Sequence, residues 1–342
     1  MRTAQRWIYA KRPTAAVGAE HFCLETFEAP APGRGEVRLQ ADYFSVDPYM
    51  RIQQAARNTY DAPHPLGIVQ QGAVIGRVVE MGADVSALAV GDWVSAYSGW
   101  QTQATLPVSA VQRIDGAATS PTHYLGVLGM PGRTAWFGLM EAGRPQPGDT
   151  VVVSGAAGAV GSLVVQFAKR AGCTVVGIAG GKSKCDFVRD TLGADIAIDY
   201  REHADWQSLS NHLHDRAGGV DVYFDNVGGI VTDAVLPLIK RRARVVICGQ
   251  ISQYDGALDT PNLGPRFLQH LLFQRASITG ILSRDFVHRM DEYLARATPW
   301  VARGEVHLAE TRIAGFEKLP EALGMLGTGG NTGKLIVSRA AA

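Results

Sequence analysis

Three glycines spaced three residues apart follow a short run of valines. Residues 150–154 (TVVVS) are typical of a strand buried on both faces, and helical periodicity begins after the last glycine. Small residues at such a turn let backbone N–H groups and the positive end of a helix approach a pyrophosphate. The alternative is a tight turn whose glycines serve packing alone. The predicted dinucleotide contacts are Gly155, Ala156, Ala157, Gly158, Ala159, Val160 and Gly161.

The end of the second predicted strand, 174–179, indicates which dinucleotide would bind. In folds that bind NAD, this strand usually ends in an acidic residue that accepts a hydrogen bond from the ribose 2′-OH. Here Gly180 and Gly181 follow the strand, then Lys182 and Lys184, with no acid among them. Glycines leave room for a 2′-phosphate and lysines supply charged donors, so the sequence favours NADPH over NADH. The alternative for each lysine is a helical turn that faces solvent.

Apolar runs alternate with helical stretches over residues 125–300. Repeated units of this kind predict an α/β fold with a doubly wound parallel sheet, the Rossmann arrangement. A long helix is expected over 285–303, followed by a tail that contains the strand-like run 334–338. Local pattern leaves open whether this tail joins the parallel sheet or the preceding domain. The predicted strands are 150–154, 174–179, 195–199, 220–225, 244–248 and 277–282.

The first 120 or so residues have a different pattern. Short runs at 36–44, 72–80 and 92–97 are separated by turns rich in Gly, Pro and Asp. Such runs predict an all-β unit, a partly open barrel. The length of 342 residues also suggests two domains.

Charge and cysteine usage narrow the class of protein. A formal net charge of +1 gives no field that would attract a nucleic acid or an anionic membrane. The four cysteines form no CxxC pair, which argues against a disulfide framework and fits a reducing compartment. We find no apolar run of signal-peptide or bilayer-spanning length. These features predict a soluble, cytoplasmic protein without nucleic-acid or membrane partners.

Six separated motifs occur in one order along the chain. As an ordered set they resemble the medium-chain dehydrogenase/reductase superfamily, and within it the leukotriene B4 dehydrogenase, prostaglandin (15-oxo) reductase and 2-alkenal reductase branch. The resemblance implies a GroES-like barrel of residues 1–124 with 301–342, a Rossmann domain of residues 125–300, and a homodimer built by sheet extension. The motifs are 45–51 (SVDPYMR), 129–139 (GMPGRTAWFGL), the glycine turn, 223–229 (YFDNVGG), 247–252 (ICGQIS) and 331–334 (NTGK).

The resemblance also implies an activity, the NADPH-dependent reduction of the carbon–carbon double bond of enals and enones. Two alternatives stay open: a quinone reductase on the same scaffold, and a cofactor-binding protein with little catalysis of its own. Carried onto matching positions, Lys184 and Tyr200 would contact the 2′-phosphate, beside Gly180. The other cofactor contacts implied are Met130, Thr134, Asn226, Gly249, Ile251, Tyr254 and Asn331.

The neighbouring alcohol dehydrogenases need a catalytic zinc held by three protein ligands. Where the first cysteine ligand is expected, this chain reads SVD at 45–47, and where Gly-His-Glu is expected it reads GIVQQG at 67–72. No cysteine lies between Cys23 and Cys173. The sequence therefore predicts no metal site and a zinc-independent enzyme.

Without a metal, a hydrogen-bond donor must polarise the carbonyl group of an enone. Several relatives carry a tyrosine where this chain has Phe273, which lacks a hydroxyl. The remaining candidates are Tyr60, in the loop 57–61, and Tyr49, in the SVDPYMR motif. The alternative for Tyr49 is a packed aromatic residue with a hydrogen-bonded hydroxyl.

Overall fold

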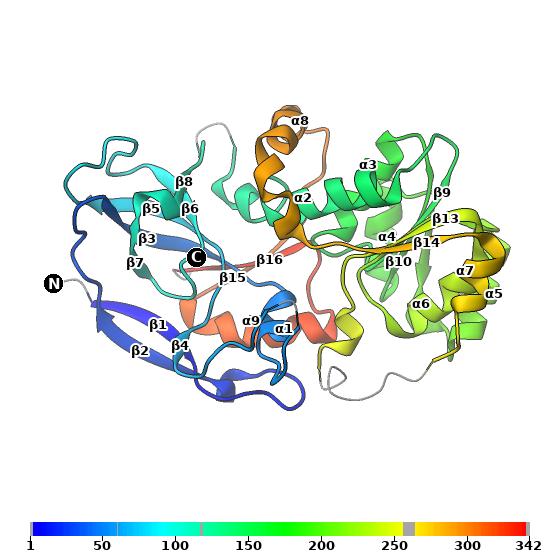
Figure 1. Cartoon of the computed structure of the whole chain (residues 1–342), viewed down its shortest axis with the longest axis horizontal. Helices are drawn as coiled ribbons and strands as arrows, with labels where there is room; N and C mark the ends of the chain where they lie inside the picture. The colour runs from blue at the N-terminus through cyan, green and yellow to red at the C-terminus, as the bar shows by residue number, and fades with distance from the viewer. Residues whose placement is uncertain (1–2, 60, 117–118, 256–263, 340–342) are drawn as a thin grey trace. The chain divides into compact units, whose positions relative to one another are not determined.

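The computed structural model describes residues 3–59, 61–116, 119–255 and 264–339. The chain forms two compact units, which are coloured along the sequence in Figure 1. One unit combines Met1–Leu125 with Glu310–Ala342, and the other is Gly126–Ala309. The C-terminal tail therefore belongs to the same unit as the N-terminal half of the chain.

The second unit contains a six-stranded parallel sheet with the strand order β11-β10-β9-β12-β13-β14. The order reverses between β9 and β12, which is the switch point where such sheets bind ligands at the carboxyl ends of their strands. The predicted Rossmann arrangement is confirmed. The strands are β9 (Thr150–Ser154), β10 (Thr174–Ala179), β11 (Ile196–Asp199), β12 (Val220–Asp225), β13 (Ile239–Ile247) and β14 (Ser277–Gly280).

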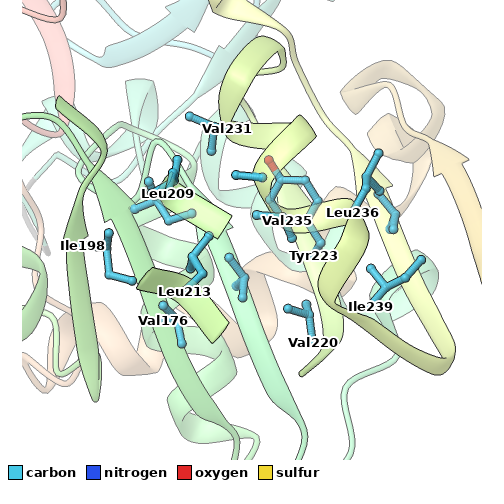
Figure 2. Packing of buried hydrophobic residues seen from close by; sticks show 14 of the residues in the cluster. Val176, Ile198, Leu209, Leu213, Val220, Tyr223, Val231, Val235, Leu236 and Ile239 are labelled. Atoms are coloured by element: carbon cyan, nitrogen blue, oxygen red, sulfur yellow. The ribbon is translucent and has the colours of Figure 1, made fainter. Parts of the chain in front are cut away.

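One face of this sheet is covered by α5 (Trp206–Ala217) and α6 (Gly229–Val235). Figure 2 shows Leu209 and Leu213 of α5 packed towards side chains of the strands. Removing these apolar side chains from water is the main source of stability for this layer. The fully buried members of this cluster include Val152, Val176, Tyr223, Val231, Val235 and Val245.

The opposite face receives the alternate residues of the same strands, because successive strand side chains point to opposite sides. There α3 (Gly161–Arg170) buries most of its side chains, and α4 (Lys182–Asp186) is followed by Val188, which contacts the sheet at Gly177. Gly138 follows α2 (Met130–Phe137) and allows a close approach, since a Cβ there would lie 2.9 Å from Cε2 of Phe224.

The first unit is built from two antiparallel sheets with a parallel edge. One has the order β2-β1-β4, and the other has the order β15-β16-β3-β5-β6-β8, with β7 also paired to β3. Their strands are β1 (Thr3–Tyr9), β2 (Phe22–Glu28), β3 (Glu36–Ser45), β4 (Ile68–Val69), β5 (Val74–Met81), β6 (Trp93–Ala96), β7 (Gln103–Pro107), β8 (Val111–Arg113), β15 (Glu310–Ala314) and β16 (Lys334–Ser338).

The tail strand β16 answers the question that local pattern left open. It pairs antiparallel with β3, with Ile336 opposite Ser45, and parallel with β15. Ile336 and Val337 are fully buried, so the strand is part of the core of the first unit. A pairing across nearly 300 positions is decided by this burial and not by any local signal.

A buried ion pair fastens β16 to the segment after β3. The Lys334 Nζ lies 2.9 Å from Oδ1 of Asp47, and the two side chains are 3% and 5% exposed. The same ammonium donates to the carbonyl oxygens of Val46 at 2.8 Å and Leu335 at 3.1 Å. The Ser45 hydroxyl donates to the Asp47 carboxylate from the other side. With its three donors used, Lys334 meets the condition under which a buried charge is tolerated.

The helices differ from expectation mainly at their ends. The helix predicted over 285–303 is a 3-10 helix over Ser283–Arg289 followed by α8 (Met290–Ala302). The remaining α-helices are α1 (Tyr49–Gln53), α7 (Leu268–Gln274) and α9 (Leu319–Thr328). Within residues 3–59, 61–116, 119–255 and 264–339, no helix is both long and apolar enough to span a membrane.

Candidate cofactor site

The glycine turn connects β9 to α3. Gly155 has a φ of +59°, and the N–H of Gly158 donates to its carbonyl oxygen at 2.9 Å. A Cβ on Gly161 would overlap that same carbonyl group, so the helix can begin here only with glycine. Val160 precedes the helix and supplies no capping side chain. The positive end of α3 therefore lies at this turn, an arrangement that can bind an anion.

The loop after β12 lies against this turn at the switch point. The backbone N–H of Asn226 donates to the Ser154 hydroxyl at 2.8 Å, and its side-chain amide donates to the Ser154 carbonyl oxygen at 2.8 Å. A Cβ on Gly155 would lie 3.5 Å from Cβ of Asn226. Gly155 and Asn226, both expected to contact the cofactor, are therefore neighbours.

A buried carboxylate, Asp225, holds this arrangement together. Its side chain is fully buried at the end of β12. Asp225 belongs to the motif 223–229, but the sequence alone did not indicate a role for it. One oxygen, Oδ1, accepts four hydrogen bonds, and Oδ2 accepts a fifth. The donors are the hydroxyls of Ser154 (2.8 Å), Tyr223 (2.9 Å) and Thr232 (2.6 Å, to Oδ2) and the N–H groups of Val227 (2.9 Å) and Gly228 (3.0 Å).

The hydroxyl of Tyr223 is kept protonated in this network. Burial, and next the charge of Asp225, raise the pKa of Tyr223 well above its ordinary value. The phenol therefore serves as a donor to the carboxylate. Such a network, with its donors and acceptor satisfied, fixes the loop geometry around it.

The loop after β13 is fixed to the same strand end. The N–H groups of Cys248 and Gly249 donate to the backbone carbonyl oxygen of Asp225 at 2.8 Å and 3.1 Å. Ile251 donates to the carbonyl oxygen of Asn226 at 3.3 Å, and the Tyr254 hydroxyl accepts from the Gln250 N–H at 2.9 Å. Three predicted cofactor contacts therefore lie in the loop after β13, next to the loop that carries Asn226: Gly249, Ile251 and Tyr254.

The ends of β10 and β11 form the other side of the predicted site. Ala179 pairs with Asp199, so Gly180 and Tyr200 leave the sheet side by side. A Cβ on Gly180 would lie 2.9 Å from the Tyr200 ring. The Asp199 carboxylate belongs to β11 and accepts the N–H groups of Gly181 at 2.9 Å and Arg201 at 3.0 Å. No acidic side chain occupies the end of β10 itself, between Ala179 and Lys184.

The two lysines after β10 have different surroundings. Lys182 is exposed and forms an ion pair with Asp186 one turn along the helix. Lys184 is half-buried, and its pKa is lowered first by burial and next by the positive charge of Arg201. Sequence reasoning did not single out Arg201, although it directly follows Tyr200.

The other predicted residues lie apart from these loops in the sequence. Met130 and Thr134 lie on α2, where the Thr134 hydroxyl donates to the Met130 carbonyl oxygen at 2.7 Å. Asn331 and Tyr49 belong to the first unit, and Asn331 donates to the Gly333 carbonyl oxygen at 2.8 Å. Tyr60 lies outside the described residues.

Tyr49 is the first residue of α1, and its side chain is hydrogen-bonded to that of Tyr97. Gln53 also bonds to Tyr97, whose pKa is raised by burial of its hydroxyl although half of the side chain is exposed. Tyr97 is a second hydroxyl that sequence reasoning missed. Only the folded position of the loop after β6 brings it to α1.

Potential metal ligands do not gather in the part of the chain that the structure describes: no three or more His, Cys, Asp or Glu side chains form a group that could hold an ion. Asp47, at the expected position of a zinc ligand, is instead paired with Lys334. Phe273, which the resemblance places where several relatives have a tyrosine, lies on α7 with 70% of its surface exposed.

Comparison with known proteins agrees with this geometry. Residues 5–114 match the family model described as the N-terminal domain of oxidoreductase, and residues 159–299 match the model described as zinc-binding dehydrogenase. The parallel sheet, the glycine turn and these matches define a nucleotide-binding oxidoreductase. The chain belongs to the medium-chain dehydrogenase/reductase family, in the branch that lacks the zinc ligands.

Two relatives and one solved structure resemble this chain over most of its length. The chain is 37% identical over 337 residues to the NADPH-dependent curcumin reductase of Escherichia coli, covering 97% of this chain and 96% of that protein. It is 37% identical over 308 residues to the NADP-dependent 2-alkenal reductase of Nicotiana tabacum, covering 89% and 88%. The crystal structure of CurA from Vibrio vulnificus in complex with NADPH superimposes with a TM-score of 0.91 at 39% identity, covering 99% and 100%.

Proposed function

We propose that this protein is an NADPH-dependent reductase of the carbon–carbon double bond of α,β-unsaturated aldehydes or ketones. The observation that carries the proposal is the end of β10, where Gly180 and Gly181 replace an acidic residue and Tyr200 lies beside them. A carboxylate there would repel a 2′-phosphate, whereas glycine and a nearby lysine accommodate it. The relatives that share nearly the whole chain length are named as reductases that use NADPH or NADP.

The residues present fit the cofactor. The turn from Gly155 to Gly161 would hold the pyrophosphate, and Lys184 with Tyr200 would hold the 2′-phosphate. When bound, NADPH supplies the hydride for the reduction. The further contacts that we propose are Met130, Thr134, Gly180, Asn226, Gly249, Ile251, Tyr254 and Asn331.

The chain must also stabilise negative charge on the substrate oxygen. We propose that Tyr49 donates a hydrogen bond to that oxygen, because its hydroxyl belongs to a hydrogen-bonded group with Tyr97 and Gln53 that keeps it oriented. Tyr60 remains the second proposed donor. A tyrosine or a water molecule would then deliver the proton to the α-carbon.

The proposed reaction is tested by following NADPH oxidation with a panel of 2-alkenals and enones, and identifying the product by mass. We expect the saturated aldehyde or ketone and loss of one equivalent of NADPH. No turnover across the panel would contradict the proposal, and naphthoquinone turnover far above that of any alkenal would favour the quinone reductase. Tight NADPH binding with no turnover of either class would indicate a binding protein.

The role of Tyr49 needs a variant with a matched control. Tyr49→Phe should lower kcat by about 10²-fold, the lower end of the range for a positioned acid–base group, with little change in NADPH affinity. Tyr43→Phe removes a hydroxyl from a tyrosine of β3 that stacks on Trp93, and it should leave kcat unchanged. Equal activity of both variants would exclude Tyr49 as the donor.

We further propose that the two units act as separate domains. The first unit, Met1–Leu125 with Glu310–Ala342, would be a GroES-like domain facing the substrate, and the second, Gly126–Ala309, would bind the cofactor. From the sequence the bounds of these domains are predicted as 1–124 with 301–342 and 125–300. The proposal is supported by the return of β16 to β3 and by the switch point of the parallel sheet. A cytoplasmic location is proposed from the cysteines, which are free thiols in the described part of the chain.

A homodimer is proposed from the exposed edge of the parallel sheet. Strand β14 is the last strand of that sheet, and its four residues are all exposed. The neighbouring helix α7 exposes Leu268 (70%), Leu272 (72%) and Phe273 (70%). An unpaired edge beside exposed apolar side chains favours pairing with a second copy, which would extend the sheet.

A further inference from the structure

Arg201 lies in the 3-10 helix Tyr200–Glu202 that follows β11, next to the residues proposed to bind the 2′-phosphate. The register of β10 and β11 brings Gly180 beside Tyr200, and the next residue along the chain is Arg201. A Cβ on Gly180 would lie 2.9 Å from Nε of Arg201 and 2.9 Å from Cε1 of Tyr200. The guanidinium and the tyrosine ring therefore approach the same glycine.

The backbone of Arg201 is held in place by Asp199. One carboxylate oxygen accepts the N–H of Arg201 at 3.0 Å and the N–H of Gly181 at 2.9 Å. This single oxygen joins the loop after β10 to the loop after β11. The Arg201 side chain is in turn oriented by Tyr200, which it hydrogen-bonds, with the guanidinium carbon 5.9 Å from the ring centroid.

The structure also brings two positive charges together at this point. Arg201 is near enough to Lys184 that its charge contributes to lowering the pKa of the lysine. Like charges repel each other, and a dianion bound by both side chains would relieve that repulsion. A guanidinium can also donate two parallel hydrogen bonds to one phosphate, which an ammonium cannot.

We propose that Arg201 is a second cationic contact for the 2′-phosphate of NADPH and a determinant of the preference for NADPH over NADH. The phosphate would lie over Gly180, between Lys184 and the guanidinium of Arg201. This inference rests on the proposed function, because it takes NADPH to be the cofactor. It adds a positively charged residue from the 3-10 helix Tyr200–Glu202, which follows β11, to the predicted contacts Lys184 and Tyr200.

Equilibrium binding to the full-length protein tests the assignment without requiring turnover. The probes are NADPH and 2′,5′-ADP, which carry the phosphate, and NADH and 5′-AMP, which lack it. Arg201→Ala should weaken binding of the first pair about tenfold, the effect of one charged hydrogen-bonding group at a partly exposed site, and change the second pair by less than about twofold. Arg201→Lys should recover part of the loss because it restores the charge without the planar fork.

Arg189→Ala is the matched control. Arg189 is an exposed cation of the segment that follows α4 and pairs with Asp186 and Asp190, so its removal should leave the affinity for every probe within about twofold. In the double variant Lys184→Ala with Arg201→Ala, the loss of binding free energy for 2′,5′-ADP should differ from the sum of the losses in the two single variants. The two effects are not additive because both side chains would bind one phosphate. The melting temperature of Arg201→Ala should equal that of the wild type because the side chain is exposed.

Equal weakening of all four probes by Arg201→Ala, or an equal effect of Arg189→Ala on 2′,5′-ADP, would overturn the assignment. The outcome is separable from the proposed reaction. A protein that fails to reduce enals but shows the selective loss with 2′,5′-ADP would contradict the reaction and support Arg201. An enal reductase without that loss would support the reaction and contradict Arg201.

Discussion

Replacing Asp225 by alanine should destabilise the protein far more than replacing it by asparagine. Alanine removes the acceptor of five donors in a fully buried site. The Ser154 and Thr232 hydroxyls can turn to other partners, so the cost falls mainly on the N–H groups of Val227 and Gly228. The Tyr223 hydroxyl also has an alternative partner, the Thr232 hydroxyl at 3.1 Å. At about 1–3 kcal/mol for each of the two unpaired buried N–H groups, the expected loss in free energy of unfolding is about 2–6 kcal/mol.

Asparagine keeps the shape and an acceptor oxygen at the Oδ1 position, which receives four of the five hydrogen bonds. Its amide would replace Oδ2 and donate to the hydroxyl of Thr232, which then accepts instead of donating. The expected loss is about 1 kcal/mol, since charged acceptors become neutral while the cost of burying the charge disappears.

Urea unfolding followed by circular dichroism, with NADPH titrations of the same variants, measures these effects. Asp221→Ala is the control on the same strand: its side chain is 19% exposed and accepts from the Thr150 N–H and from Lys240, so its loss should be about 1 kcal/mol. Asp225→Ala should also bind NADPH more weakly, because the loop that carries Asn226 loses its support. A stability of Asp225→Ala within about 1 kcal/mol of wild type, or equal losses for both Asp225 variants, would refute the reasoning.

Three further predictions concern the dimer surface, the reactivity of the thiols and the pH dependence of stability. Leu272→Lys, on the exposed face of α7, should shift the protein from dimer to monomer in sedimentation at low concentration. The control Val90→Lys changes an exposed apolar residue of the first unit and should leave the dimer intact. A dimer unaffected by Leu272→Lys would contradict this interface. With a disulfide reagent at pH 8, the exposed thiol of Cys23 should react rapidly and the buried thiols of Cys173 and Cys185 slowly. Burial raises the pKa of each buried thiol from 9.0 to about 11, so little reactive thiolate is present. Cys23→Ser should abolish the fast phase of the reaction. Since those pKa values are higher in the folded state, the free energy of unfolding should fall as the pH rises from about 9 to about 11, and a flat profile there would contradict the burial of the thiols.

Local sequence pattern predicted the parallel sheet well where burial alone decides the residue type. Strand β9 has the bounds expected from its valines, because a central strand covered on both faces tolerates only apolar side chains over most of its length. Strand β13 begins at Ile239, earlier than the predicted start at 244. The prediction missed this beginning because the residues after Ile239 are exposed and charged: Lys240, Arg241 and Arg242. Charged residues at the start of a strand gave no apolar run to detect.

The candidate site was predictable only in part for a similar reason. The glycine turn and Lys184 are local features of two successive strand–helix connections, β9 to α3 and β10 to α4. Arg201 gains its meaning from the pairing of β10 with β11, and Tyr97 from the folding of the loop after β6 towards α1. Asp225 was contained in a recognised motif, but its role depends on hydrogen-bond donors from β9, β12 and α6 together. Such convergence of distant segments leaves no periodic signal in a sequence.

The ion pair between Lys334 and Asp47 has a consequence for biosynthesis. The two residues are 287 positions apart, so Asp47 leaves the ribosome long before its partner is made. Residues 126–309 of the second unit are contiguous and can fold during translation, whereas the first unit lacks β15 and β16 until synthesis ends. A chain truncated before Lys334 would leave the Asp47 carboxylate without its cation and residues 43–45 of β3 without β16, one of the partner strands of β3. Cellular quality control would then act on an incomplete first unit joined to a folded second unit.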